Sequence, residues 1–187
     1  MKKVLVIDID DVLVDSYMLI MLNKFLGTTY KEEDFSDYYF QDAIKDSKKL
    51  EEYFKFVFSQ DMYKDIPVKP GVLEILPKLN KKYDLLLCTD ILIPNYEWEA
   101  DKEFVSKFNM LKEKFSFLNP KQFMFMRRKE LLHADIMIDD KPTNFGPHVK
   151  QKLMLTAYHN KKLDNDTLKK QGITRVDTWQ VIASLLL

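Results

Sequence analysis

Short apolar runs that end in an acidic or hydroxyl residue recur along the chain. Three of them cover residues 4–7, 84–88 and 135–138, and they end at Asp8, Thr89 and Asp139. Runs this short, rich in aliphatic residues and bounded by charge, are typical of strands buried on both faces of a parallel sheet. Two further strand candidates cover residues 122–126 and 152–157.

Amphipathic segments separate the strands. The spacing of apolar residues predicts helices over 16–26, 72–81, 97–117 and 178–186, and Gly27 is placed to cap the first of them. Trp98 and Trp179 are expected to be core anchors. Alternating strands and helices indicate an α/β fold, a Rossmann-like parallel sheet with helices on both faces.

Residues 28–66 differ from the rest of the chain. They are dense in aromatic and charged residues and carry no strand pattern, which indicates a helical insertion. Together with the preceding helix this gives an approximate helical cap over residues 16–66. At 187 residues, the chain is long enough for one well-buried core, so we expect a single domain over 1–187 with the cap inserted in it.

Composition excludes several classes of function. Lys and Arg total 29, as do Asp and Glu, so the formal charge is zero, which argues against a nucleic acid polymer as partner. The single cysteine, Cys88, lies in an apolar run and favours a reducing, cytoplasmic location. The apolar runs fall far short of the roughly 18 residues of a membrane span, so we expect no membrane partner.

The strand ends bring acidic residues together. Parallel packing would place Asp8, Asp10, Asp139 and Asp140 at one edge of the sheet, and four carboxylates in a small volume need protons or a cation to compensate them. Oxygen ligands without His or Cys favour a hard cation, and a partial protein shell suits Mg²⁺. The sequence therefore predicts a Mg²⁺ site. His133, His148 and His159 form no recognisable ligand set and are taken as structural.

A metal, a threonine hydroxyl and a lysine around one carboxylate are the parts that phosphoryl transfer needs. An aspartate can itself be the nucleophile and form an aspartyl-phosphate. Lys121, Lys129 and Lys141 are the candidate lysines.

The order of these residues along the chain resembles that of a known family. Asp8-Ile9-Asp10, Thr89, Lys129 and Asp139-Asp140 are similar to motifs I to IV of the haloacid dehalogenase-like phosphatases. Within that superfamily the chain resembles the 5'(3')-deoxyribonucleotidases along nearly its whole length. The local matches are residues 4–15, 87–89, 127–129, 138–142 and 155–160, with Trp179 following.

The resemblance implies a role for each matching residue. Asp8 would be the nucleophile and a Mg²⁺ ligand, and Asp10 the general acid and base, with its backbone carbonyl on the metal. Thr89 and Lys129 would hold the phosphate. Asp140 would be the direct metal ligand, with Asp139 orienting the site beside it.

The insertion would then be the small cap that closes over nucleotides and stacks aromatics on the base. Within the aromatic run 38–40, Tyr39 and Phe40 are the candidate substrate contacts. Packing inside the cap is an equal alternative for them, because aromatics at helical spacing are usually core.

The chain departs from the family pattern at three places. Asp11 stands where glycine is usual, so either the backbone there is not restricted to glycine or the side chain points away. Asp90-Ile91 replaces Ser-Pro after Thr89, and Ser16 replaces an aromatic residue expected to stack on the base.

We therefore expect a Mg²⁺-dependent phosphatase of small phosphate monoesters, acting on deoxyribonucleoside 5'- or 3'-monophosphates through an aspartyl-phosphate. A phosphatase of another small metabolite, a catalytically weak ligand-binding member and a receiver-like phosphorylation module stay open as alternatives. A homodimer is also left open.

Overall fold

Six strands form one parallel sheet in the computed structural model, which describes residues 1–35, 39–91 and 96–187. The spatial order is β3-β2-β1-β4-β5-β6. The strands are β1 (Val4–Ile7), β2 (Asp84–Thr89), β3 (Phe123–Phe125), β4 (Ala134–Asp139), β5 (Val149–Leu155) and β6 (Ile173–Val176). The predicted α/β fold with a parallel sheet is confirmed.

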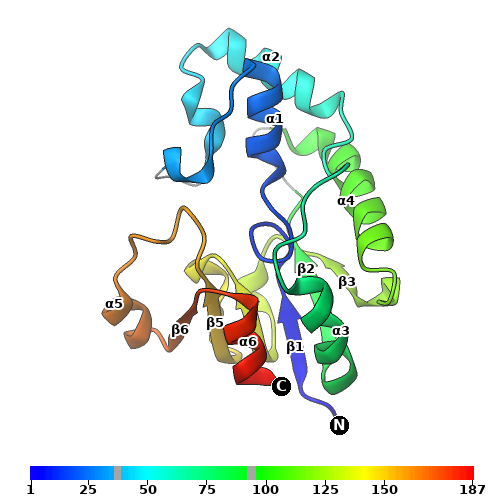
Figure 1. The fold of residues 1–187 in the computed structure, drawn as a ribbon, viewed down its shortest axis with the longest axis vertical. Helices are drawn as coiled ribbons and strands as arrows, with labels where there is room; N and C mark the ends of the chain where they lie inside the picture. Colours follow the sequence, from blue (N-terminus) through cyan, green and yellow to red (C-terminus); the bar gives the residue numbers. More distant parts are fainter. Residues whose placement is uncertain (36–38, 92–95) are drawn as a thin grey trace.

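Both faces of the sheet are covered (Figure 1). Alternate residues of β1 point to opposite faces, as in any strand. Leu5 and Ile7 belong to the larger core cluster, together with residues of α3 (Val72–Lys82) and α6 (Trp179–Leu186). Val6 belongs to a smaller cluster with Leu168 of α5 (Asn165–Lys170). The central strand is therefore buried on both sides, as its unbroken apolar run predicts.

The sheet order brings the three predicted strand ends together. Strand β1 lies between β2 and β4, and Ile7 is level with Leu87 and Ile138 in the two neighbours. The chain order reverses between β1 and β4, which makes this edge the topological switch point where parallel sheets bind ligands. Asp8, Thr89 and Asp139 consequently meet at one edge.

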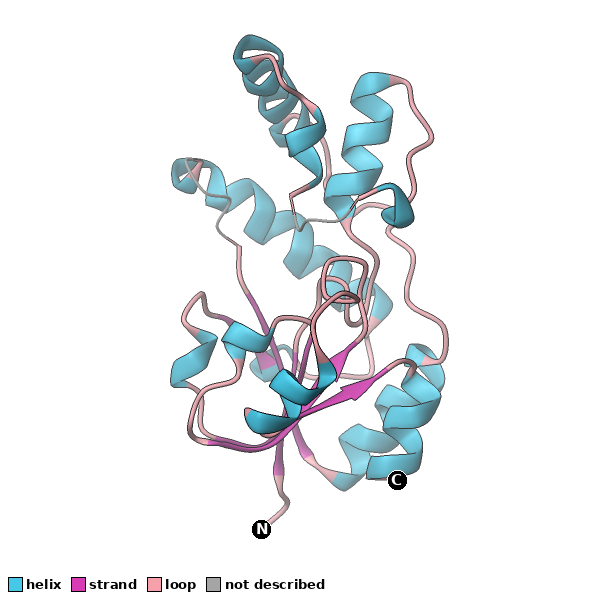
Figure 2. Cartoon of the chain, turned by 90° about the vertical axis from the view of Figure 1, so that its left-hand side faces the viewer, coloured by secondary structure: helices cyan, strands magenta, loops and turns pink. Residues whose placement is uncertain are grey.

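The segment between β1 and α3 is helical where the structure describes it. It contains α1 (Tyr17–Leu26), η1 (Glu32–Asp34), η2 (Phe40–Ala43) and α2 (Ser47–Phe58). Gly27 ends α1 with a φ of 65°. Figures 1 and 2 show α1 and α2 beyond the carboxyl ends of the strands, at the opposite end of the molecule from the N-terminus. Phe25 packs on Tyr53 with the ring centroids 5.5 Å apart, so the insertion has aromatic packing of its own.

The helix after β2 buries charged as well as apolar residues. It comprises η3 (Glu97–Glu99) and α4 (Ala100–Lys114), and its buried line runs through Glu103, Lys107 and Met110. Trp98 is 97% exposed, so its prediction as a core anchor is wrong. The physical reason is that Trp98 lies in η3, outside α4, and α4 turns Lys107 toward the strand ends, where Lys107 contacts Asp10, Thr89 and Asp90. Trp179, in contrast, is buried and donates from Nε1 to Val12 O at 2.9 Å, as predicted.

Two elements were not anticipated, β6 and α5. Strand β6 has only Ile173 and Val176 as apolar residues and is fixed by parallel pairing with β5, which its own sequence cannot show. Strand β5 also begins at Val149, earlier than the predicted residue 152. The remaining short helices are η4 (Pro120–Gln122), η5 (Lys129–Leu131) and η6 (Pro142–Asn144).

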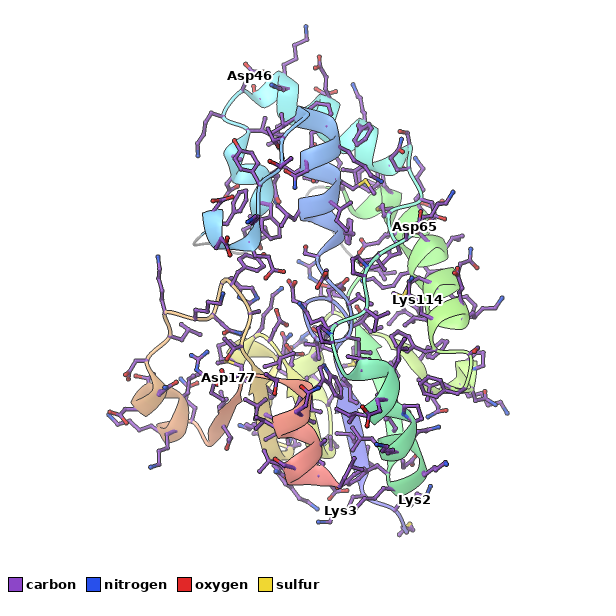
Figure 3. All side chains as sticks on the ribbon, viewed as in Figure 1. Lys2, Lys3, Asp46, Asp65, Lys114 and Asp177 are labelled. Atoms are coloured by element: carbon purple, nitrogen blue, oxygen red, sulfur yellow. The ribbon has the colours of Figure 1, made fainter. Side chains whose placement is uncertain are left out.

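Charged side chains lie at both ends of the molecule. Figure 3 places Lys2 and Lys3 near the amino end of β1 and Asp46 at the far end of the insertion. None of the helices formed by the described residues is long and apolar enough to cross a bilayer.

Candidate active site

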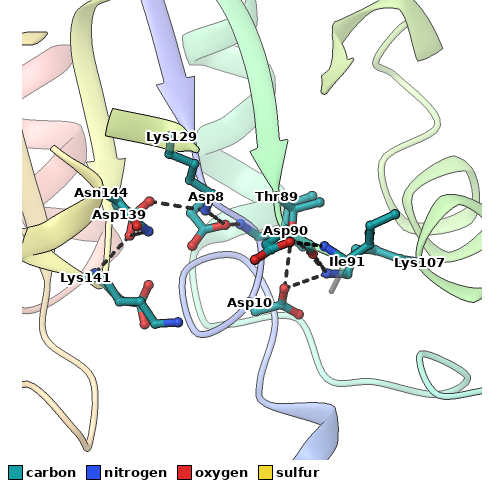
Figure 4. A network of polar contacts seen from close by, with 12 residues as sticks. Asp8, Asp10, Thr89, Asp90, Ile91, Lys107, Lys129, Asp139, Lys141 and Asn144 are labelled. Atoms are coloured by element: carbon teal, nitrogen blue, oxygen red, sulfur yellow. Dashed lines mark hydrogen bonds and ion pairs between the residues drawn. The ribbon is translucent and has the colours of Figure 1, made fainter. Parts of the chain in front are cut away.

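Asp8 lies at the centre of the polar cluster (Figure 4). It follows β1 directly, it is 6% exposed, and its Oδ1 is 2.5 Å from Lys129 Nζ. The Ile9 amide donates to the same oxygen at 2.7 Å. Burial raises the pKa of Asp8 to about 6, although Lys129 opposes the shift. A carboxylate fixed in this way presents its other oxygen to the site in a defined direction.

Lys129 comes from η5, and it is the lysine among the three candidates whose ammonium contacts Asp8. Its Nζ also lies 3.3 Å from Asp139 Oδ2. Burial lowers the pKa of Lys129, but the charges of Asp139 and Asp8 raise it by more than that. The pKa is therefore above its usual value, and the ammonium stays charged. Gly146 permits this placement, because a Cβ there would lie 1.8 Å from the Glu130 carbonyl oxygen of η5.

Asp139 ends β4 and Asp140 follows it, and the two residues have different surroundings. Asp139 Oδ1 accepts from the Lys141 amide at 2.9 Å and from Asn144 Nδ2 at 2.8 Å, and Oδ2 faces Lys129. Both oxygens of Asp139 are thus in use. Asp140 is contacted through Oδ2 by His159 Nε2 at 2.6 Å. Asp140 therefore has the carboxylate with more capacity for a further ligand.

The donor set fits a hard divalent cation. Asp8, Asp139 and Asp140 each offer one oxygen, and these atoms all lie within 4.8 Å of one another. All three residues are buried. Burial raises the pKa of Asp139 although Lys129 opposes the shift, and the charge of Asp140 adds to it, so a bound cation would compensate buried negative charge here. Oxygen-only ligands of this kind suit Mg²⁺.

Asp10 lies on the other side of Asp8 and is held by three donors. Tyr63 Oη donates to its Oδ1 at 2.6 Å, while Thr89 Oγ1 at 3.1 Å and Lys107 Nζ at 2.8 Å contact its Oδ2. Burial alone would raise the pKa of Asp10, but Lys107 and the hydrogen bond from Tyr63 lower it below its usual value. Its side chain is not part of the acidic group around Asp8, and a metal contact through its carbonyl stays a prediction.

Lys107 was missed by sequence reasoning. It is fully buried on α4, and its Nζ also donates to Thr89 Oγ1 at 3.0 Å and to Asp90 O at 2.6 Å. Glu103, one helical turn earlier, lies 3.4 Å from the same ammonium. The available signal was a Glu and a Lys four residues apart on a line that continues into Met110. Such a pair is usually read as a solvated helix face.

Asp11 and His159 also reach the site. Asp11 adopts a φ of 58°, the left-handed conformation that aspartate tolerates better than most residues, and it is 3% exposed. The alternative that its side chain points away is wrong, because Asp11, Asp140 and His159 offer ligand atoms within 4.8 Å of one another. Burial and the charge of Asp140 raise the pKa of Asp11 well above its usual value. The prediction that all three histidines are purely structural overlooked this contact of His159.

The candidate substrate aromatics differ in exposure. Phe40 is 1% exposed and stacks on Tyr158 of the core with centroids 4.5 Å apart, so in this conformation it packs between the insertion and the sheet. Tyr39 is 46% exposed. Residue 38 of the same run lies outside the described residues. A substrate contact by Tyr39 or Phe40 stays a prediction.

Two curated relatives are similar over most of the chain. A 5'(3')-deoxyribonucleotidase of Bacillus subtilis is 26% identical over 189 residues, covering 100% of both proteins. A 5'(3')-deoxyribonucleotidase of Clostridium acetobutylicum is 28% identical over 167 residues, covering 86% of this chain and 85% of that protein.

Solved structures show the same fold. A conserved haloacid dehalogenase-like protein of Agrobacterium tumefaciens superposes with a TM-score of 0.60 at 15% identity, covering 99% of each chain. A haloacid dehalogenase-like hydrolase of Streptococcus pneumoniae gives a TM-score of 0.55 at 15% identity, covering 98% of each.

The family model described as "5' nucleotidase, deoxy (Pyrimidine), cytosolic type C protein" matches residues 2–187, almost the entire chain. The ordered acidic, hydroxyl and lysine residues at the strand ends and the haloacid dehalogenase-like fold agree with that match. The chain belongs to this family of 5'-nucleotidases, which are phosphoric monoester hydrolases.

Proposed function

We propose that this protein is a Mg²⁺-dependent phosphatase of small phosphate monoesters, with deoxyribonucleoside 5'- or 3'-monophosphates as its substrates. The main observation in support is the buried Asp8 carboxylate 2.5 Å from Lys129, with Asp10 and Thr89 at the same edge of the sheet. The names of the two relatives support the choice of deoxyribonucleotide.

Asp8 is the nucleophile in this proposal. Its fixed carboxylate attacks phosphorus, the bond from phosphorus to the ester oxygen breaks, and an aspartyl-phosphate forms on Asp8. Lys129 offsets the charge of the phosphoryl oxygens without moving, because its position is already set by Asp8 and Asp139. Mg²⁺, held by Asp8 and Asp140 with Asp139 beside them, would supply further neutralisation of that charge.

Asp10 transfers the proton. In the described conformation it is ionised, because Lys107 and the hydrogen bond from Tyr63 lower its pKa in spite of burial. A phosphate oxygen that takes over Thr89 and Lys107 removes their contacts with Asp10, which raises the pKa of Asp10 and favours proton uptake. The protonated Asp10 then gives its proton to the leaving oxygen, and the resulting carboxylate activates the water that hydrolyses the aspartyl-phosphate.

The helical insertion is proposed as the cap that selects the substrate. It contributes Tyr63 to the site directly, through the hydrogen bond to Asp10. The exposed Tyr39 is the candidate for stacking on a base. A cytoplasmic location is proposed from the family description and the buried, free Cys88.

A substrate panel tests this function. The purified protein is assayed with Mg²⁺ against deoxyribonucleoside 5'- and 3'-monophosphates, the matching ribonucleotides and sugar phosphates. The proposal expects Mg²⁺-dependent release of phosphate, fastest from deoxyribonucleotides. Preference for a sugar phosphate would move the substrate to another class, and release without added metal by a chelator-treated protein would contradict the Mg²⁺ requirement.

A further inference from the structure

A second group of metal-binding side chains lies beside the proposed Mg²⁺ carboxylates. Asp11, Asp140 and His159 offer one ligand atom each, all within 4.8 Å of one another. Asp140 belongs to this group and also to the group around Asp8. Asp11 and His159 have no part in the phosphoryl transfer described above.

Asp11 carries a buried oxygen that nothing satisfies. Its Oδ1 has no hydrogen-bond partner among the described residues, and the residue is only 3% exposed. A buried carboxylate oxygen without a partner costs free energy, so such atoms are rare unless an ion or water meets them. Lys69 interacts electrostatically with Asp11, but its ion pair at 3.1 Å is with Asp15.

The backbone at Asp11 adds to this cost. A non-glycine residue at a φ of 58° is strained by roughly 1–2 kcal/mol relative to glycine. Glycine, the residue that the family pattern has here, would avoid both the strain and the buried charge. A bound cation would offset both costs, since it would compensate the charges of Asp11 and Asp140 together.

We propose that Asp11, Asp140 and His159 form a second cation site, which binds a first-row transition ion of the Zn²⁺ type. The imidazole nitrogen sets it apart from the oxygen-only group around Asp8, because His favours Zn²⁺ over Mg²⁺. Two carboxylates and one imidazole leave a fourth position for water, as in open zinc sites. His159 Nε2 already lies 2.6 Å from Asp140 Oδ2, so one ion between them replaces that hydrogen bond.

Zn²⁺ binding in saturating Mg²⁺ tests the site. Equilibrium dialysis with metal analysis is expected to give one Zn²⁺ per chain for the wild type. Asp11→Asn and His159→Gln are each expected to weaken Zn²⁺ binding at least about tenfold. Asparagine matches aspartate in size and tolerates the left-handed backbone, so Asp11→Asn is expected to fold. Zn²⁺ should raise the melting temperature of the wild type and not that of either variant.

Two further variants separate this site from other binding. Asp8→Asn weakens the proposed Mg²⁺ site and should leave Zn²⁺ affinity unchanged, so the inference stands even if the proposed phosphatase function fails. His148→Gln is the matched histidine control, because His148 stacks on His133 near Val4, at the amino end of β1. The second site would be overturned if the wild type bound no Zn²⁺, or if Asp11→Asn and His159→Gln bound Zn²⁺ with wild-type affinity. Loss of Zn²⁺ binding in Asp8→Asn or His148→Gln would also overturn it.

Discussion

Three donors share the carboxylate of Asp10. Tyr63, Thr89 and Lys107 hold it as an ionised group, whereas its proposed role requires a proton. The arrangement is coherent if substrate phosphate displaces Asp10 from Thr89 and Lys107. Lys107 then has two functions: it keeps Asp10 charged before substrate binds, and it contacts phosphate afterwards.

Replacing Lys107 by methionine tests these functions. The change leaves Asp10 and Glu103 without their buried cation, so we expect a loss of stability of about 3–5 kcal/mol and a fall in kcat of about 10²- to 10³-fold. Lys112→Met, on the exposed side of α4, is the control and should behave as the wild type. Melting temperatures and steady-state rates check both effects. A folded Lys107→Met protein with wild-type kcat would contradict the role of Lys107.

Mg²⁺ affinity should depend on pH through Asp8. Because burial raises the pKa of Asp8 to about 6, a proton competes with the cation below that pH. Since the cation displaces one proton from Asp8, the apparent Mg²⁺ affinity should fall about tenfold for each pH unit below about 6. Above that pH the affinity should change little. Calorimetric titration of the wild type and of Asp8→Asn measures the slope, and an affinity that stays constant down to about pH 5 would count against Asp8 as a ligand.

At the scale of elements, the short helix η5 decides where Lys129 lies. It packs against the segment that follows β4, and the contact is close enough that a Cβ at Gly146 would meet Glu130 O at 1.8 Å. This is a backbone atom, so it cannot move aside as a flexible side chain could. The position of Lys129, the lysine proposed to bind phosphate, thus depends on a glycine in the segment before β5.

Gly146→Ala is expected to displace η5 and with it Lys129. Both stability and kcat should fall, because Lys129 would lose its fixed geometry to Asp8. Gly172→Ala is the control: it adds the same methyl group at a φ of 71° with no atom within 4 Å, and should cost only the roughly 1 kcal/mol of left-handed strain. Equal stability and activity of the two variants would show that η5 can shift without consequence.

Elements and site residues that follow from local pattern could be predicted from the sequence. Asp8 and Asp139 directly follow or end strands whose apolar runs are unbroken, and this local rule suffices to place them. Lys107 could not be placed, because its function depends on the rotation of α4 about its axis. Only contacts distant in sequence, such as that of Lys107 with Asp10, set this rotation.

At the scale of the whole molecule, one sheet order explains the site. The parallel order places β1 between β2 and β4, so residues 8, 89 and 139 become neighbours although the chain separates them widely. The helical insertion contributes Tyr63, and Phe40 stacks on Tyr158 across the boundary with the core. Strand β6 lay beyond the reach of sequence pattern because its pairing with β5, and not its own two apolar residues, defines it.

The central claim is that Asp8 forms a covalent aspartyl-phosphate. The most direct measurement is a rapid acid quench of a single turnover with Mg²⁺ and a deoxynucleoside monophosphate labelled with ³²P in its phosphate. The account predicts transient ³²P on the wild-type protein, released by hydroxylamine as expected of an acyl-phosphate, and neither label nor product with a folded Asp8→Asn variant. Product formation by Asp8→Asn at the wild-type rate, or the same label on that variant, would contradict it.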